Sequence, residues 1–81
     1  MENRAVVILN LEERGETYDI DIPLDLTASE LLEGLSTAFS LGIDVDDAVQ
    51  CYVKVENPVA FMHGRKSLAE FGVMNGSIIT I

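Results

Sequence analysis

The sequence has few basic residues, and that shortage excludes two classes of partner. Five Lys and Arg stand against fourteen Asp and Glu, so the net charge is -9. Nucleic acids and anionic membrane surfaces are bound through clustered positive charge, so we expect neither as a partner. A basic or neutral protein partner is compatible with this charge, although its simpler role is to keep a small domain soluble.

Cysteine and long apolar runs are scarce as well. Cys51 is the single cysteine, so no internal disulfide can form, which is typical of a reducing compartment. No stretch approaches the ~20 apolar residues of a membrane-spanning helix, and the first residues lack the pattern of a secretory signal peptide. We therefore expect a cytoplasmic protein without direct membrane insertion.

The apolar content is nevertheless sufficient for a folded core. Hydrophobic residues make up 48% of the 81 positions, which distinguishes the chain from a disordered acidic tail. A chain of this length builds one compact core at most. We expect a single domain that covers residues 1–81.

Two segments near the N-terminus are predicted to pair as an antiparallel hairpin. Residues 5–11, AVVILNL, are rich in β-branched and aliphatic side chains and contain neither Gly nor Pro. Residues 17–23, TYDIDIP, alternate with period two, which places Tyr18, Ile20 and Ile22 on one face of a half-buried strand.

The hydrophobic period then changes from two to that of a helix. From Ala28 to Phe39 the apolar residues, among them Ala38, recur at spacings of three and four, which indicates an amphipathic helix. Thr27 and Glu30 have the spacing of a capping box at its start. Gly42 is the expected left-handed residue at its end.

Three further strands are predicted, at residues 49–56, 59–62 and 77–81, with a turn at Asn57-Pro58 between the first two. Residues 67–73 are expected to form a short helical turn that attaches a long loop to the core. The order of elements predicts an α+β fold in which one main helix covers one face of the sheet. The last strand is expected at the centre of the sheet, parallel to the first.

This order, with the segments LTASELLEGL and GRKSLAEFGVMNGSIITI, resembles the β-grasp fold of ubiquitin-like proteins over nearly the whole chain. The opening VVILNLEERGETYDIDIP and the closing GVMNGSIITI are similar to the small bacterial YukD/EsaB family, ubiquitin-like accessory proteins of type VII secretion. The resemblance implies a mixed sheet of four to five strands with one helix. It also implies a cytosolic, non-enzymatic component that supports export of small helical substrates through a membrane machine.

A second family remains open. The segment SLAEFGV partly resembles a run in the small ubiquitin-like auxiliary subunits of bacterial multicomponent monooxygenases. Such a subunit would also act by binding a protein partner, so the two hypotheses share a fold and differ in the complex that they join.

A stand-alone enzyme has no support in the sequence, and we expect no catalytic, cofactor or metal site. His63 is not accompanied by a Ser or Cys nucleophile in any motif. Cys51 lies on the Val-lined face of its strand and is expected to be a buried structural thiol. Asp44, Asp46 and Asp47 lack the spacing of a calcium-binding loop.

Covalent conjugation is also not expected. Ubiquitin-like modifiers and sulfur carriers use a flexible tail that ends in Gly-Gly, because only glycine allows the narrow approach to an activating enzyme. The sequence ends in SIITI and contains no Gly-Gly. We therefore expect its last residues to be held in the sheet, so that the protein acts through non-covalent binding.

The outer face of the sheet is the candidate binding surface. Alternation that buries Val7 and Leu9 points their neighbours outward, and the same alternation applies to the third and last strands. The predicted surface consists of Val6, Ile8, Tyr52, Ile78 and Thr80. Such patches often mark partner surfaces, although β-branched residues also occur in strands for local reasons. The expected partner is another protein or a second copy of the chain.

Overall fold

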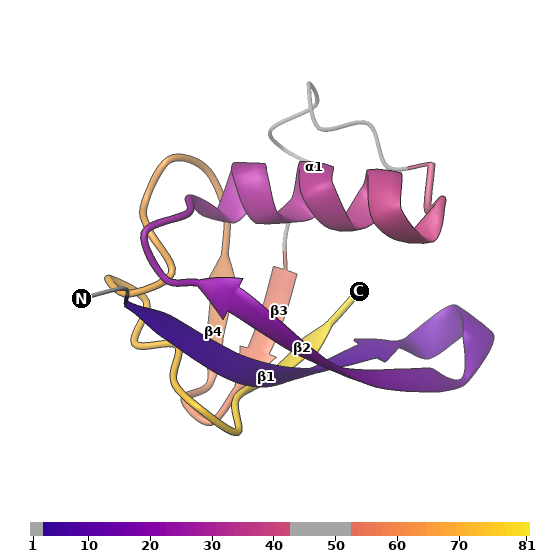
Figure 1. Ribbon diagram of the computed structural model, residues 1–81, viewed down its shortest axis with the longest axis horizontal. Coiled ribbons are helices and arrows are strands. Elements are labelled where there is room, and N and C mark those ends of the chain that lie inside the picture. Colours follow the sequence, from indigo (N-terminus) through magenta and orange to yellow (C-terminus); the bar gives the residue numbers. More distant parts are fainter. Residues whose placement is uncertain (1–2, 43–52) are drawn as a thin grey trace.

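The computed structural model describes residues 3–42 and 53–81. The elements are β1 (Arg4–Leu11), the 3-10 turn η1 (Glu12–Arg14), β2 (Glu16–Pro23), α1 (Ala28–Phe39), β3 (Val53–Glu56), β4 (Ala60–Met62) and β5 (Ile78–Thr80). In Figure 1 the strands form one layer and α1 lies across one face of it. The predictions for residues 43–52, including those for Asp44 and Cys51, fall outside the described residues.

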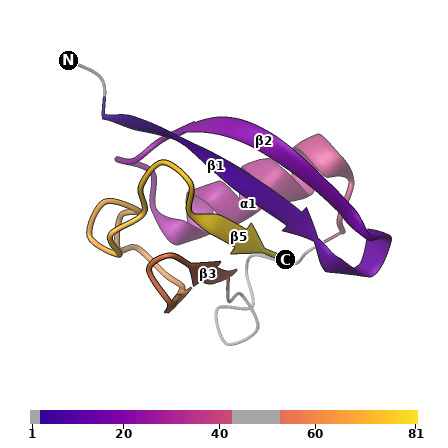
Figure 2. The same cartoon turned by 90° about the horizontal axis from the view of Figure 1, so that it is seen from below.

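The five strands form one mixed sheet in the order β2-β1-β5-β3-β4. β5 is parallel to β1 and antiparallel to β3, while the hairpins β1–β2 and β3–β4 are antiparallel. The last strand therefore lies between β1 and β3 at the centre of the sheet, as Figure 2 shows. This arrangement confirms the predicted α+β, β-grasp fold, with five strands and one covering helix.

The first hairpin is long and regular. Its register runs without interruption from the pair Arg4–Pro23 to the pair Leu11–Glu16. Gly15 closes the hairpin in a left-handed conformation, with φ of 63°, and its N–H donates to the Glu12 carbonyl. Glycine adopts this conformation without the steric cost of a Cβ, so the sequence ERGE supports a tight return of the chain.

The start of α1 is built as the sequence predicted. The Thr27 hydroxyl accepts a hydrogen bond from the Glu30 N–H at 3.1 Å, and the Glu30 carboxylate accepts one from the Thr27 N–H at 3.0 Å. Both partners of the capping box are therefore present, which satisfies two N–H groups that a helix start otherwise leaves unpaired.

The end of α1 differs from the prediction. Ser40, and not Gly42, is the left-handed residue that ends the helix, with φ of 55°. Two tertiary contacts explain the earlier stop: the Phe39 ring packs against Tyr18 with centroids 5.1 Å apart, and the Arg14 guanidinium donates to the Ser40 carbonyl. The hairpin thus holds the helix end in place, which a reading of the helix alone could not foresee.

The core lies between α1 and the inner face of the sheet. Its buried side chains come from every strand and from the helix: Ala5, Val7, Leu9, Leu11, Ile22, Ala28, Leu31, Leu32, Leu35, Val53, Val55, Met62 and Ile79, with Leu24, Leu68 and Val73 from the connecting segments. Ala38 was expected in the apolar stripe of the helix but is exposed. Phe39, in the last helical turn, is partly buried against the core and also packs on Tyr18.

The long loop before β5 is attached to the core by a short turn. The Ser67 hydroxyl accepts from the Glu70 N–H, and the Glu70 carboxylate accepts from the Ser67 N–H. Leu68 is fully buried, and its N–H donates to the Leu26 carbonyl at 2.9 Å. The predicted helical turn over residues 67–73 is therefore confirmed as an anchoring element.

The ladder of β5 extends one residue past Thr80. The Ile81 N–H donates to the Asn10 carbonyl at 3.0 Å, and the Ile81 carbonyl accepts from the Glu12 N–H at 3.2 Å. Residues 78–81 are thus paired along β1, close to the predicted span of 77–81. Within the described part of the chain, no helix has the length and apolar character that a membrane crossing requires.

Candidate functional site

The face of the sheet opposite α1 is the candidate site. Along β1, Val7 and Leu9 point to the core and are completely buried. Val6 points to the opposite face and is 51% exposed. Ile8 and Ile78 are half-buried, because neighbouring side chains on this face cover part of each. The period-two alternation of the strands therefore sends one set of apolar residues to the core and a second set to the outer surface.

Strand register places four predicted residues side by side. Ile8 on β1 lies opposite Ile78 on β5, and Thr80 on β5 follows on the same face. Val6 precedes Ile8 on β1 by one alternation. The structure therefore brings Val6, Ile8, Ile78 and Thr80 together, and we call these four residues the sheet-face patch. Tyr52, the fifth predicted member, lies outside the described residues.

Neighbouring strands border the sheet-face patch with polar side chains. On β2, Asp19 lies opposite Ile8 and Asp21 lies opposite Val6. On β3, Glu56 lies opposite Ile78, and Lys54 lies opposite Thr80. An apolar strip thus runs between an acidic border on β2 and a mixed border on β3, which is the organisation of an apolar centre with a polar rim.

Phe61 lies on the same face of the sheet, although it is not among the residues predicted for the binding surface. This residue is 61% exposed and lies opposite Lys54 in the β3–β4 pairing. Its neighbour Met62 is fully buried. Since adjacent strand residues point to opposite faces, the alternation of the predicted strand 59–62 was the sequence signal that could have located Phe61.

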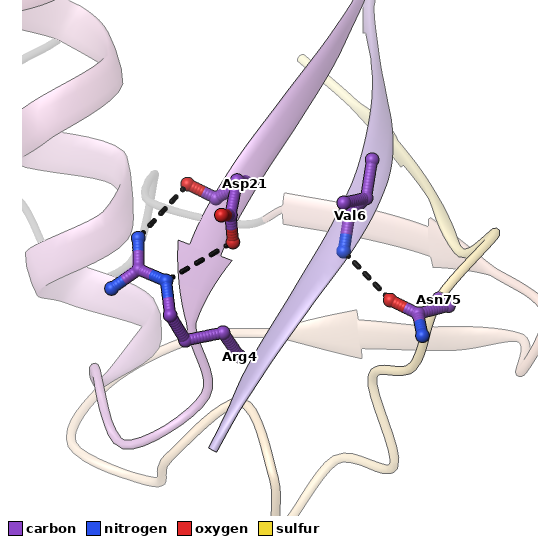
Figure 3. A network of polar contacts seen from close by, with 4 residues as sticks. All are labelled: Arg4, Val6, Asp21 and Asn75. Atoms are coloured by element: carbon purple, nitrogen blue, oxygen red, sulfur yellow. Dashed lines mark hydrogen bonds and ion pairs between the residues drawn. The ribbon is translucent and has the colours of Figure 1, made fainter. Parts of the chain in front are cut away.

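Arg4 and Lys54, the cations that the described parts of β1 and β3 place on this face, are each paired within it. The Lys54 ammonium lies 3.5 Å from the Glu56 carboxylate, and the Arg4 guanidinium lies 3.1 Å from the Asp21 carboxylate, as Figure 3 shows for the second pair. Exposed pairs of this kind contribute about 0–1 kcal/mol to stability. Their main consequence is electrostatic. The two pairs neutralise Asp21 and Glu56, whereas Asp19 remains a negative charge beside the apolar strip.

Val6 is held in place by the loop that precedes β5. Its N–H donates to the Asn75 side-chain oxygen at 2.8 Å (Figure 3). Its carbonyl accepts from the Gly76 N–H at 3.0 Å. Asn75 and Gly76 therefore continue the β1 ladder beyond the short strand β5. This end of the sheet-face patch is consequently fixed by one hydrogen bond to a side chain and one between backbone groups.

Among residues 3–42 and 53–81, no three His, Cys, Asp or Glu side chains lie close enough to hold a metal ion. Partial burial raises the pKa of Tyr18 above its ordinary value, and the neighbouring Glu16 carboxylate raises it further. Both effects move the phenol away from ionisation at neutral pH, so Tyr18 acts as a neutral aromatic side chain.

A shallow hollow of about 300 Å³ lies at the other end of the hairpin. It is lined by Leu11, Glu13, Arg14, Leu41 and Ile81. The guanidinium at its rim already donates to the Ser40 carbonyl, so it is committed to the end of α1. The hollow is therefore lined by both apolar and charged side chains, of which Arg14 contributes to the fold.

The comparison with protein-family models decides between the two families considered above. Residues 6–81 match the model described as "WXG100 protein secretion system (Wss), protein YukD". The chain belongs to the YukD family. This family is a component of type VII secretion, so the match supports the secretion hypothesis and gives no support to the monooxygenase alternative.

Solved structures show the same fold at low sequence identity. The C-terminal ubiquitin-like domain of mouse tubulin-specific chaperone e is 11% identical, with a TM-score of 0.72 over 98% of this chain and 84% of that one. A designed protein based on ubiquitin is 22% identical, with a TM-score of 0.68 over 96% and 85%. The ubiquitin-like domain of Plasmodium falciparum Dsk2 is 18% identical, with a TM-score of 0.60 over 99% and 97%. The comparison with curated protein sequences gave no match.

Proposed function

We propose that this YukD-family chain is a non-enzymatic protein-binding component of a type VII secretion system and acts through its sheet-face patch. The family match is the observation that carries the proposal, because it assigns the chain to the secretion machinery. We expect the protein to work in the cytoplasm and to contact the cytosolic parts of the membrane-bound machine.

The geometry of the outer face supports binding as the mode of action. Val6 is half exposed, and it continues into Ile8 and Ile78 without an intervening charge. Covering this apolar surface with a partner makes the free energy of binding more favourable, by roughly 25 cal/mol per Å² of apolar area removed from water. Phe61 extends the same face across β3.

The proposed mode is non-covalent. Both backbone groups of Ile81 are hydrogen-bonded, the N–H to Asn10 of β1 and the carbonyl to Glu12 of η1, so this residue continues the pairing of the sheet. Denaturing electrophoresis of cell extracts, probed for the protein, should therefore detect it only at its own mass; adducts of higher mass would contradict this part of the proposal.

The patch is tested by a double substitution, Val6→Asp with Ile78→Asp, in the full chain. Each change places a carboxylate on the outer face, where it must be desolvated when a partner covers the patch. We expect the double variant to remain folded and to lose the partners that the wild type retains in pull-downs from its own cells. Mass spectrometry identifies those partners, and components of the secretion machine are the expected ones.

Ala38→Asp with Ala69→Asp is the matched control. Both alanines are exposed and lie away from the outer face, on α1 and on the turn before β5, so the control adds the same charge elsewhere. Circular dichroism verifies that both variants fold. If the control and the patch variant retain the same partners, the sheet-face patch is not the binding surface.

A further inference from the structure

The outer edge of β2 is a second surface that the sheet-face patch does not include. β2 spans eight residues and stands at one end of the strand order, so β1 is its pairing partner among residues 3–42 and 53–81. Its register with β1 contains no bulge. In Figure 2, β2 runs along one border of the sheet. Long, regular edges of this kind are uncommon in sheets unless they are covered, charged or used for pairing.

The hydrogen bonds of β1 determine which groups of β2 face outward. The Val6 carbonyl accepts from the Gly76 N–H, and the Ile8 N–H donates to the Ser77 carbonyl, so these two β1 residues direct their backbone groups toward β5. In an extended strand the N–H and C=O of one residue point to the same side, and successive residues alternate. The backbone N–H and C=O groups of Val7 and Leu9, which alternate with these residues, therefore point toward β2.

The same alternation then assigns the groups of β2. Tyr18 and Ile20 lie opposite the intervening β1 residues and direct their backbone groups toward β1. Thr17, Asp19 and Asp21 consequently direct theirs away from the sheet. The Asp21 carbonyl accepts a long hydrogen bond, 3.4 Å, from the Arg4 guanidinium. The outward groups of Thr17 and Asp19 make no backbone hydrogen bond to any described residue.

The side chains along this edge select the chemistry of a strand that could pair with it. Asp19 and Asp21 project on the outer face, opposite Ile8 and Val6. Tyr18 and Ile20 project on the inner face, where Tyr18 is 39% exposed and Ile20 is half-buried. An added strand would place alternate residues beside the carboxylates and the others beside the apolar side chains.

We infer that the β2 edge receives an extended segment of a partner protein that alternates cationic and apolar residues, by strand addition. Main-chain hydrogen bonds to Thr17 and Asp19 supply affinity, and a cationic residue beside Asp19 supplies specificity, since Asp21 is already paired with Arg4. The two carboxylates also disfavour a second copy of the chain, because antiparallel pairing of β2 with itself brings acidic side chains together. The occupant is therefore a basic partner strand.

Peptide binding tests the inference on the full chain. The probe is a short capped peptide of alternating valine and lysine, and its control replaces each lysine by glutamate. We expect the lysine peptide to slow amide hydrogen exchange at Thr17 and Asp19, measured by NMR. We expect the glutamate peptide to bind about tenfold more weakly, because it replaces an attraction at the exposed Asp19 carboxylate by a repulsion.

Two variants of one position separate the backbone contribution from the charge. Asp19→Pro removes the outward N–H and leaves the hydrogen bonds between β1 and β2 intact, which is the position in a strand where proline is tolerated. We expect it to abolish binding of the lysine peptide. Asp19→Lys keeps the N–H and reverses the charge, so it should weaken the lysine peptide and strengthen the glutamate peptide. The opposite effects of Asp19→Lys on the two peptides test the inference even if Asp19→Pro does not fold.

Three outcomes would overturn the inference. The first is unchanged exchange at Thr17 and Asp19 with either peptide, and the second is equal affinity for both peptides. The third is a wild-type dimer in sedimentation experiments that Asp19→Pro dissociates, which would make a second copy the occupant. Val6→Asp with Ile78→Asp should bind the lysine peptide normally, so failure at this edge and failure of the sheet-face patch give different results.

Discussion

The Asn75 side chain accepts a hydrogen bond from the Val6 N–H at 2.8 Å, although 69 positions separate the two residues in the sequence. β1 is longer than β5, so its first residues extend beyond the last partner that β5 itself provides. Asn75 supplies that missing acceptor. The contact thus extends the central parallel pairing by one hydrogen bond and orients the exposed end of the sheet-face patch.

Replacement of Asn75 by alanine should therefore loosen the start of β1. The contact is exposed, so water can replace the lost acceptor, and we expect a destabilisation of about 0.5–1 kcal/mol. Urea unfolding measures this change, and faster amide exchange at Val6 locates it. Asn75→Asp retains a side-chain acceptor and serves as the control. If the alanine variant leaves the exchange rate of Val6 unchanged, the hydrogen bond does not persist in solution.

Ser77 should be the more costly polar residue to remove. Its buried hydroxyl donates to the Asn57 carbonyl at 2.6 Å and accepts from the Met74 N–H at 3.0 Å, which joins the β3–β4 turn to the start of β5. Ser77→Ala leaves both groups without this partner, at a cost of about 1–3 kcal/mol. Thr37→Ala, an exposed position on α1, should change the free energy of unfolding by less than about 0.5 kcal/mol. Equal effects of the two substitutions would show that the Ser77 bridge has no special role.

Gly34→Ala should stabilise the protein. Gly34 lies inside α1, and a Cβ added there meets no atom within 4 Å. Alanine restricts the unfolded chain and favours the helix by roughly 1 kcal/mol relative to glycine. Thermal unfolding should show a higher Tm. Gly15→Ala is the contrasting change, because φ of 63° at that position strains any residue with a Cβ, and it should lower the Tm.

Phe61→Asp tests how far the binding face extends. The side chain is exposed, so the substitution should change stability by no more than about 0.5 kcal/mol. If a partner covers the face as far as β4, pull-downs should recover less of the partner retained through the sheet-face patch. Glu33→Asp, an exposed conservative change on α1, is the control. Full recovery by Phe61→Asp would restrict the surface to β1 and β5.

Several elements could be predicted because they depend on neighbours in sequence. The alternation along β2 and the capping box of Thr27 and Glu30 require only local geometry, which the residue types reveal. The alternation of β1 also predicted that Val6 and Ile8 point away from the core. Phe61 was within reach of the same reasoning, since the alternation of its strand had only to be extended.

Other features depend on segments that the fold brings together. Ser40 ends α1 because Arg14 and Tyr18 of the hairpin meet the helix there, and that meeting cannot be inferred from the helix sequence. The contact between Asn75 and Val6 likewise depends on the register between β1 and the loop before β5. Local sequence determined the elements and the faces of the strands, because side-chain direction follows from backbone period. Tertiary structure alone decided which side chains became neighbours and which edge of the sheet stayed open, because both depend on the relative placement of distant segments.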